Sequence, residues 1–381
     1  MSESAKIVPI VMCGGAGTRL WPVSRDSMPK QFISLFGGDS TFQRTMRLLS
    51  DASVFEDPIV ITNADYRFTA QDQLQAIGVT ASIVLEPTRR DSAAAVAAAT
   101  VLALARSEEA VVGVFAADHV VQDGALFVRT CAQAGRVAAQ GRIVTIGVPP
   151  THPATGYGYI RPGADIGGGA RNVDAFVEKP DAARAAQYLL DGYLWNSGNF
   201  IFSARAMREE FEAHASDVMG PVADAVTRAK RDLDFLLLDA EAFSRARKTS
   251  IDYAVMERTA KSAVVPGGYG WSDVGGWGAV WDLSPKDDGG NAVTGRGYVL
   301  GGGGNLIRAD DQLVAVLGLD DIVVVSTRDA VLVAAKDQAD KVKDMVALIR
   351  ARGESEAGEH REIYRPWGKY LSIDMGARYQ V

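Results

Sequence analysis

Short apolar runs alternate with longer amphipathic or alanine-rich stretches through the first part of the chain. Four apolar runs have the length of β-strands: residues 7–12, 57–63, 82–87 and 110–119. Three intervening stretches have helical character: residues 40–50, 65–78 and 92–108. The fourth run is nearly all apolar, which indicates a strand covered on both faces. This alternation predicts a mostly parallel sheet flanked by helices.

The pattern changes beyond residue 140. Four further strand-like segments are predicted: residues 142–148, 156–163, 173–180 and 199–204. A helix is predicted over 204–219. Glycine is dense from 287 to 304, and short Val-rich strands follow at near-even spacing, which indicates a small all-β domain of the solenoid kind. Residues 338–352 read as a closing helix. We therefore predict a large α/β domain over 1–285, a small β-solenoid-like domain with its helix over 286–352, and a linker with a further segment over 353–381.

Composition narrows the class of protein. The chain has 381 residues, 47% of them hydrophobic and 23% charged, with a net charge of −7. An acidic protein of this kind is not expected to bind nucleic acid. Cys13 and Cys131 are expected to be buried reduced thiols, and the four histidines show no metal-ligand spacing. Without a signal pattern or a membrane-length apolar run, the expected location is the cytoplasm.

A glycine-rich segment follows the first predicted strand, in the sequence MCGGAGTRLWPVSRDSMPKQF. Glycines allow close backbone approach, and successive N–H groups in such a turn form an anion-binding concavity. Arg19 and Lys30 add full positive charges, so a phosphate chain is the expected ligand. The segment is neither a Walker loop nor a complete dinucleotide fingerprint, because Leu20 stands where the third glycine of that fingerprint would be. The alternative is a glycine-rich turn that binds nothing.

Carboxylates and one amide stand at the ends of other predicted strands. Asp118 ends an apolar strand, where it could cap the next helix or serve a site. Asp273 lies among aromatic residues and glycines, and the two aspartates could share a Mg²⁺ ion. Glu86 could accept hydrogen bonds from the N1–H and N2–H donors of guanine, or it could be a solvated loop carboxylate. Glu178 with Lys179 could be a surface pair or part of a cleft, and Asn196 is suited to hydrogen-bonding hydroxyls.

Eight segments in order closely resemble the mannose-1-phosphate guanylyltransferase family, over essentially the whole chain. They are GGAGTRLWPVSRDSMPKQF, LEPTRRDS, AADH, GYGYI, FVEKP, WNSGNF, SIDYAVMER and WSDVGGW. The resemblance implies an α/β fold with a glycosyltransferase-A-like (Rossmann-like) mixed sheet flanked by helices, and a small C-terminal domain like a left-handed β-helix. It also implies Mg²⁺ or another divalent cation as cofactor, and GTP and mannose 1-phosphate as substrates.

The resemblance assigns roles by position. Gly14, Gly15, Gly17 and Thr18 would wrap the GTP phosphates, while Arg19 and Lys30 would neutralise the departing pyrophosphate. Asp118 and Asp273 would hold the metal. The remaining assignments concern guanine (Glu86, Pro87 and Asp91) and mannose 1-phosphate (Gly158, Glu178, Lys179 and Asn196).

Two segments depart from the family pattern. The family usually reads GRNTAP after the EP pair, whereas this chain reads RRDSAA, with Asp91 where asparagine is common. An aspartate can accept a hydrogen bond from guanine but, when ionised, cannot donate one to its O6. Residues 360–381 resemble the entry into a cupin-like phosphomannose isomerase domain, and the sequence ends before any metal-binding histidine cluster. We therefore expect no isomerase activity from this chain.

The predicted reaction is the transfer of GMP from GTP to mannose 1-phosphate, and it requires no protein nucleophile. The substrate phosphate is itself the nucleophile, so the protein's tasks are positioning and charge neutralisation. The same reaction on glucose 1-phosphate with UTP or dTTP is the nearest alternative, and a catalytically silent sugar-nucleotide sensor is another. A nicotinamide dehydrogenase is disfavoured by the broken glycine pattern. No membrane partner is expected, and the Val-rich tail is compatible with a homodimer.

Overall fold

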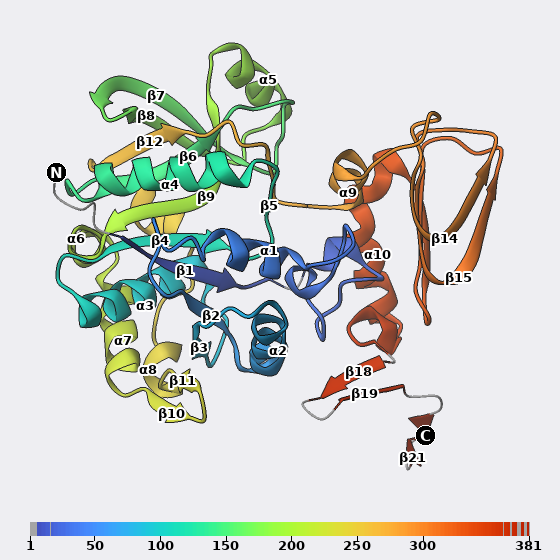
Figure 1. The fold of residues 1–381 in the computed structure, drawn as a ribbon, viewed down its shortest axis with the longest axis horizontal. Helices are drawn as coiled ribbons and strands as arrows, with labels where there is room; N and C mark the ends of the chain where they lie inside the picture. Colours follow the sequence, from blue (N-terminus) through green and yellow to red (C-terminus); the bar gives the residue numbers. More distant parts are fainter. Residues whose placement is uncertain are drawn as a thin grey trace. The chain divides into compact units, whose positions relative to one another are not determined.

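The computed structural model describes residues 6–15, 17–360, 362–365, 368–371, 375–376 and 379–380. The chain forms two compact units (Figure 1). Unit 1 consists of residues 1–14, 44–67 and 71–271, and unit 2 of residues 15–43, 68–70 and 272–381. The glycine-rich segment from Gly15 onward therefore belongs to the same unit as the C-terminal part of the chain. Sequence order alone did not predict that grouping.

Unit 1 is built on an eleven-stranded mixed sheet with the order β10-β11-β3-β2-β1-β4-β9-β6-β12-β8-β7. Its strands are β1 (Ile7–Cys13), β2 (Ile59–Asn63), β3 (Ser82–Glu86), β4 (Val111–Ala116), β6 (Ile143–Val148), β7 (Gly158–Gly167), β8 (Ala170–Glu178), β9 (Leu194–Ser203), β10 (Lys230–Asp232), β11 (Phe235–Leu237) and β12 (Ser262–Pro266). The four strands predicted first, β1 to β4, are mutually parallel. Strand β9 runs antiparallel to β4 and β6, which makes the sheet mixed.

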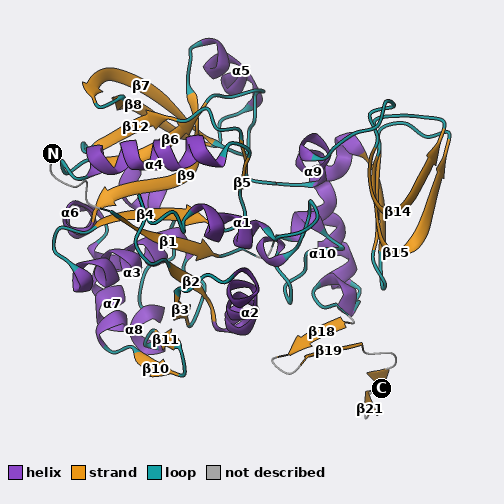
Figure 2. Ribbon diagram, in the orientation of Figure 1, coloured by secondary structure: helices purple, strands orange, loops and turns teal. Residues whose placement is uncertain are grey.

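Helices cover both faces of this sheet (Figure 2). The α-helices of the described residues, in both units, are α1 (Thr41–Leu48), α2 (Arg67–Ile77), α3 (Asp91–Arg106), α4 (Gly124–Ala138), α5 (Ala182–Leu190), α6 (Ala204–His214), α7 (Ser216–Thr227), α8 (Ala240–Ser244), α9 (Trp277–Leu283) and α10 (Val342–Ala351). Alternate residues of β1 serve the two faces, because Val8 and Ile10 pack into the core around α3, α6 and α7 while Ile7 lies against Gly135 of α4. All the alanines of α3 except Ala105 are buried, which lets this helix lie close to the sheet.

The fold predicted from the sequence is confirmed, with local differences. Gly78 ends α2 in the left-handed conformation, as predicted. The helix predicted over 204–219 is two helices, because Ala215 adopts φ −152° and breaks the run between α6 and α7. Only a short 3₁₀ turn, η1 (Thr18–Leu20), follows the glycine-rich segment. Both cysteines are free and buried, as expected, and burial raises their thiol pKa values well above normal.

Unit 2 contains the β-helix-like domain. Strands β14 (Ala292–Leu300), β15 (Leu306–Leu317) and β16 (Ile322–Ser326) pair in parallel, and β17 (Val331–Ala335) adds an antiparallel edge. Each parallel strand follows the last after a short turn, so the chain coils rather than zigzags. Ile307, Val316 and Val324 form the small core between the strands. The described chain ends with the short strands β18 (Glu362–Arg365), β19 (Gly368–Leu371), β20 (Met375–Gly376) and β21 (Tyr379–Gln380).

Outside these sheets, the two-residue strands β5 (Val120–Val121) and β13 (Trp271–Ser272) pair with each other.

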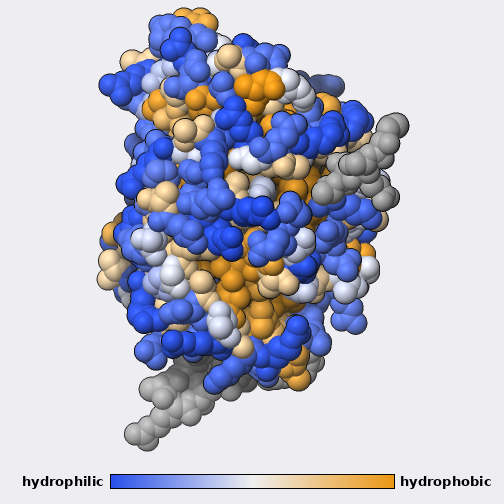
Figure 3. Space-filling model, turned by 90° about the vertical axis from the view of Figure 1, so that its left-hand side faces the viewer, coloured by the Kyte–Doolittle hydropathy of each residue, from blue (hydrophilic) through white to orange (hydrophobic). Residues whose placement is uncertain are grey.

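One face of unit 1 is mostly hydrophilic, with an apolar area at the level where α3 and α7 lie in Figure 1 (Figure 3). A hollow of about 410 Å³ is lined by residues that include Val101 and Leu104 of α3 and Met219 and Ala223 of α7. None of the residues named in the sequence as candidate site residues lines it. Among the helices of the described residues, none is both long and apolar enough to span a bilayer.

Candidate functional site

The candidate residues of unit 1 lie at one edge of its sheet. Gly14, Glu86 and Asp118 follow the carboxyl ends of the parallel strands β1, β3 and β4. Strand β9 runs the opposite way, so its beginning, with Asn196, reaches the same edge and pairs there with Gly147 at the end of β6. Gly158 at the start of β7 pairs with Glu178 at the end of β8. Ligands of open α/β sheets bind outside this edge, and the topology brings these segments to it.

Asp118 stands two residues past the end of β4. The backbone N–H of Ala117 donates to the carbonyl oxygen of Met12 (3.2 Å), which keeps this turn beside the end of β1. The negative charge of Asp118 contributes to the raised pKa of Cys13, so the carboxylate lies near the start of the glycine-rich segment. His119 Nε2 is 3.7 Å from an Asp118 oxygen, and the Trp271 indole donates to His119 Nδ1 (3.2 Å). Asp118 therefore lies beside His119, whose ring in turn packs against Trp271.

Glu86 carries an unusual carboxyl group. Its Oε1 is buried and has no hydrogen-bond partner among the described residues. Burial raises the pKa of Glu86 from 4.5 to about 7. A buried acceptor without a donor costs free energy unless a ligand supplies the donor. Glu86 is thus prepared for a hydrogen-bond donor that the protein itself does not provide, and Pro87 follows it directly at the strand end.

Asp91 begins α3 in the left-handed region, with φ 68°. Asparagine and aspartate tolerate this conformation better than most residues, which accounts for an Asp where the family pattern has Asn. Its Oδ1 accepts from the N–H of Ser92 (3.0 Å), and the Ser92 hydroxyl accepts from the N–H of Ile251 (3.0 Å). Asp91 therefore provides the left-handed backbone conformation needed at the start of α3, independently of any contact between its side chain and the base.

Gly158, Glu178 and Asn196 form one compact cluster. A Cβ added at Gly158 would lie 2.7 Å from Glu178 Oε2 and 3.3 Å from Asn196 Cβ, so a larger residue here would displace the Glu178 carboxylate. Lys179 donates to Glu178 Oε1 (2.6 Å), which raises the pKa of the lysine. Lys179 adopts φ 48° and its side chain is 63% exposed, whereas that of Glu178 is 14% exposed. The left-handed backbone at Lys179, just before Pro180, thus lets the side chains of two adjacent residues meet on one side.

Three residues that were not among the predicted site residues orient the amide of Asn196. The hydroxyl of Thr145 and the N–H of Gly198 both donate to Asn196 Oδ1, at 2.9 and 3.1 Å. The Asn196 amide donates to Asp252 Oδ1 (3.3 Å). Asp252 opens a π-helical turn (Asp252–Met256), and burial with the nearby charge of Glu178 raises its pKa from 3.8 to about 6. The SIDYAVMER motif contained this signal, because it holds a carboxylate inside an otherwise apolar run.

Unit 2 brings together the other candidate residues. Lys30 Nζ donates to the carbonyl oxygens of Asp273 (2.5 Å) and Val274 (3.2 Å), which joins the glycine-rich segment to the WSDVGGW motif. Gly17 adopts φ 63° and its backbone lies against the Lys30 side chain, with a Cβ at Gly17 falling 3.1 Å from Lys30 Cβ. Gly15 adopts φ 88° with open space around it. Thr18 begins η1, and Arg19 is exposed beside it.

Asp273 lies in a strained turn. Val274 is fully buried and adopts φ 47°, a conformation that β-branched residues rarely take. Such strain persists where the surroundings demand a particular geometry, and it is common at functional sites. A Cβ at Gly275 would lie 3.1 Å from Asp273 Oδ1 and 3.4 Å from Arg19 Nη1, so the Asp273 carboxylate and the Arg19 guanidinium flank the same glycine.

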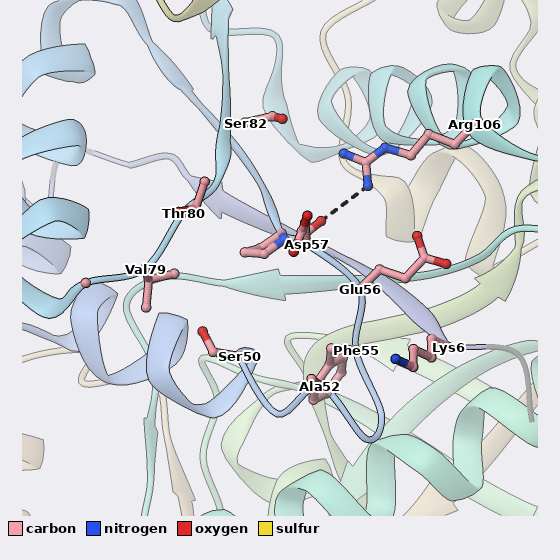
Figure 4. Close-up of a pocket in the computed structure, with 12 residues that line it drawn as sticks. Lys6, Ser50, Ala52, Phe55, Glu56, Asp57, Val79, Thr80, Ser82 and Arg106 are labelled. Atoms are coloured by element: carbon pink, nitrogen blue, oxygen red, sulfur yellow. Dashed lines mark hydrogen bonds between the residues drawn. The ribbon is translucent and has the colours of Figure 1, made fainter.

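A larger hollow lies elsewhere in unit 1 (Figure 4). Its volume is about 640 Å³, and its lining includes Lys6, Asp57, Ser82 and Arg106. Lys6 and Ser82 stand at the beginnings of β1 and β3, so this hollow is at the opposite edge of the sheet from Glu86 and Asp118. The Arg106 guanidinium donates to the Asp57 carbonyl oxygen (3.2 Å) across it. It is not the site that the sequence motifs define.

Comparison with known proteins agrees with this geometry. The nucleotidyl transferase family model matches residues 8–289, so the α/β part of the chain is a nucleotidyl transferase domain. A MannoseP isomerase/GMP-like beta-helix model matches residues 299–348, and a mannose-6-phosphate isomerase C-terminal model matches 352–381.

Curated relatives narrow the class further. Xanthan biosynthesis protein XanB of Xanthomonas campestris is 46% identical over 98% of this chain and 80% of its own length. Mannose-1-phosphate guanylyltransferase RfbM of Salmonella typhimurium is 42% identical over 98% and 79%. A crystal structure titled mannose-1-phosphate geranyltransferase, from Thermus thermophilus, is 34% identical, with a TM-score of 0.80 over 91% of this chain and 99% of that one. The chain belongs to the mannose-1-phosphate guanylyltransferase family, which confirms the resemblance found in the sequence.

Proposed function

We propose that this protein transfers GMP from GTP to α-D-mannose 1-phosphate, giving GDP-mannose and pyrophosphate. The proposal rests on polar groups at the carboxyl edge of the sheet in unit 1 that can bind a ligand. The main ones are the buried Glu86 Oε1, which has no hydrogen-bond partner among the described residues, and the Gly158–Glu178–Asn196 cluster. Family membership supplies the reaction class.

The chemistry is an in-line displacement at phosphorus. A phosphate oxygen of mannose 1-phosphate attacks the α-phosphorus of GTP, a new P–O bond forms, and the bond from the α-phosphorus to the α–β bridging oxygen breaks. Pyrophosphate leaves with the electron pair of that bond. In this proposal Gly14, Gly15, Gly17 and Thr18 surround the phosphates with N–H groups, and Arg19 and Lys30 neutralise the leaving group.

Guanine and mannose are assigned to separate groups of residues. Glu86 accepts from guanine N1–H and N2–H, with Pro87 and Asp91 completing the pocket. This is consistent with the raised pKa of Glu86, because a positioned donor would restore the charged form. Glu178 and Asn196 hydrogen-bond the sugar hydroxyls beside Gly158, and the exposed Lys179 ammonium reaches the sugar phosphate.

The family generally uses a divalent cation, and we assign Mg²⁺ to Asp118 and Asp273. Both supply oxygen ligands, which Mg²⁺ prefers. Mg²⁺ commonly shares its coordination between one or two carboxylates and substrate phosphates, which two aspartates from distant segments would allow. When bound, the ion would neutralise developing phosphate charge.

Release of pyrophosphate from GTP and mannose 1-phosphate tests the proposal. We expect turnover that requires Mg²⁺, stops with EDTA, and falls at least 100-fold in Asp118→Asn. Parallel assays with glucose 1-phosphate plus UTP or dTTP address the nearest alternative, and higher turnover with either pair would replace our assignment. Binding of GTP without pyrophosphate release would instead identify a silent homologue.

The assembly we propose is a homodimer. Its support is a set of exposed apolar side chains on the β-helix-like domain: Tyr298, Leu300, Leu317 and Val333. Leu300 and Leu317 are paired residues of β14 and β15 and are 73% and 74% exposed. Light scattering after size-exclusion chromatography will give the mass in solution, and a monomer at micromolar concentration would contradict the proposal.

A further inference from the structure

A fully buried arginine connects the glycine-rich segment to the β-helix-like domain within unit 2. Both terminal nitrogens of Arg25 reach the Asp329 carboxylate, Nη1 to Oδ2 at 2.7 Å and Nη2 to Oδ1 at 2.6 Å. The exposures of the two side chains are 0% and 3%. Arg25 Nε donates to the Pro22 carbonyl oxygen (3.0 Å), and Nη1 also donates to the carbonyl oxygen of Glu359. The guanidinium is thus held by side chain and backbone at once.

Asp329 is itself fixed. It lies in the turn between β16 and β17, where the Thr327 hydroxyl donates to Asp329 Oδ1 (3.0 Å) and the Thr327 N–H donates to the Ala330 carbonyl oxygen (2.9 Å). The strands on either side pair along their full lengths. The carboxylate is therefore presented by a rigid hairpin rather than by a mobile loop.

Arg25 is closely coupled to Lys30 through the backbone. Arg25 and Met28 exchange two backbone hydrogen bonds, each 3.1 Å long, which close a tight turn. Pro29 follows with φ −66° and begins the short 3₁₀ turn η2 (Lys30–Phe32). The paired hydrogen bonds and the proline restrict the backbone between Arg25 and Lys30, so a shift of the Arg25 anchor would shift the backbone that carries Lys30.

A second arginine, Arg308 of the β-helix-like domain, holds the backbone just beyond the glycine-rich segment. Arg308 is 9% exposed, and its Nη1 and Nη2 donate to the carbonyl oxygens of Leu35 and Ser34, both at 3.2 Å. The turn that carries Lys30 therefore lies between two arginine contacts, and both depend on the β14–β17 domain.

We propose that Arg25 and Asp329 are positioning residues for the transfer reaction: their ion pair fixes the turn that presents Lys30 to the triphosphate. The inference rests on the proposed function, because it takes Lys30 as a pyrophosphate-binding residue. Buried ion pairs are weak stabilisers compared with well-packed apolar residues, so stability alone is a poor reason for one here. A bidentate Arg–carboxylate pair does impose direction and distance, which an apolar contact does not. The β-helix-like domain would in this way set the efficiency of a site to which it contributes no catalytic residue.

The test compares Asp329→Asn with a matched control in the Arg25–Met28 turn. Asp26 pairs with Arg350 at 2.7 Å, but both side chains are about half exposed, so Asp26→Asn removes a similar charge pair that is screened by water. Arg25→Lys is a second, milder variant that keeps the charge and loses the fork, in case Asp329→Asn folds poorly. Each variant is assayed well below its own melting temperature, with the folded fraction measured.

We expect Asp329→Asn and Arg25→Lys to lower kcat/KM for GTP roughly tenfold to 100-fold, the range that a misplacement of about 1 Å can produce. The inhibition constant of pyrophosphate should rise in parallel, while KM for mannose 1-phosphate stays within about twofold, because its proposed ligands lie in unit 1. Asp26→Asn should match the wild type in all three. Unchanged pyrophosphate inhibition in both variants, or a loss of turnover that only follows the folded fraction, would overturn the inference. A wild type that makes no GDP-mannose would instead overturn the proposed function, and the inference with it.

Discussion

Thr145 donates its hydroxyl hydrogen to the side-chain oxygen of Asn196 across 2.9 Å, and this bond sets which way the Asn196 amide faces. With Oδ1 taken by Thr145 and by the N–H of Gly198, and with one amide hydrogen directed to Asp252, the second amide hydrogen remains for a ligand. The polarity that Asn196 offers to a sugar hydroxyl is thus decided by its neighbours. Several predictions about substrate binding depend on arrangements of this kind.

Thr145→Val should weaken mannose 1-phosphate binding without affecting GTP. The substitution keeps the shape of a fully buried side chain but removes the donor that orients Asn196. The net value of one hydrogen bond, about 0.5–1.5 kcal/mol, corresponds to a rise in KM for mannose 1-phosphate of roughly twofold to tenfold. Thr130→Val is the matched control, because the Thr130 hydroxyl donates to the Leu126 carbonyl oxygen of its own helix. Equal effects of the two variants on KM would show that Asn196 is not oriented through Thr145.

Gly158→Ala should disrupt the sugar cluster. The new methyl group would lie 2.7 Å from Glu178 Oε2, so the carboxylate must move away. We expect KM for mannose 1-phosphate to rise at least tenfold, equivalent to about 1.4 kcal/mol. Gly156→Ala, two residues earlier, meets nothing within 4 Å and should leave the constant unchanged. Wild-type kinetics in Gly158→Ala would remove Glu178 from the proposed sugar site.

Glu86→Gln should stabilise the free protein at alkaline pH and weaken GTP binding. Burial raises the folded-state pKa of Glu86 to about 7, so its contribution to stability is intact below about 4.5 and is lost as pH rises through 7. The difference between 4.5 and about 7 corresponds to on the order of 3 kcal/mol, an upper estimate for the gain in unfolding free energy that the variant shows above pH 7. Denaturant unfolding at pH 5 and pH 8.5 measures it. A gain of the same size at both pH values would refute the assignment to Glu86.

The same variant should change how GTP affinity depends on pH. In the wild type the carboxylate form of Glu86 is the better acceptor for guanine, so KM for GTP should fall as pH rises from 6 to 8. This component should vanish in Glu86→Gln, whose overall KM is higher because glutamine accepts only one of the two guanine donors well. GTP phosphates titrate identically in both proteins, so the difference between the two profiles isolates Glu86.

Gly17→Ala should impair GTP use more than it impairs folding. Gly17 and Gly38 both adopt left-handed backbone conformations in unit 2, with φ 63° and 67°, so alanine at either costs about 1 kcal/mol in strain. Only at Gly17 does the added methyl group press on Lys30, at 3.1 Å. We expect a roughly tenfold loss in kcat/KM for GTP in Gly17→Ala and less than a twofold change in Gly38→Ala, at similar melting temperatures. Matching kinetics in the two variants would argue against a role for the Gly17–Lys30 contact.

The sequence by itself determined the strands and helices of the first half and the class of the protein. Val- and Ile-rich runs have few alternatives to a buried strand, so β1 to β4 were predicted close to their observed bounds. Glycines, cations and carboxylates at strand ends pointed to phosphate chemistry, because that inference depends on residue type and on chain position only. The break at Ala215 was missed, since the composition on both sides of it is helical.

Only the tertiary structure decided which distant residues meet. The orientation of Asn196 by Thr145 and Asp252 depends on the register of β6 against β9 and on a π-helical turn far along the chain. The burial of the Glu86 oxygen, and with it the pKa near 7, follows from packing that no local pattern encodes. In the sequence Arg25 looks like an ordinary loop arginine. Folding brings it into contact with Asp329, which is 304 positions further along the chain. Electrostatics and hydrogen bonding act over a few ångströms of space, and in a sheet of mixed strand order those distances are unrelated to distance along the chain.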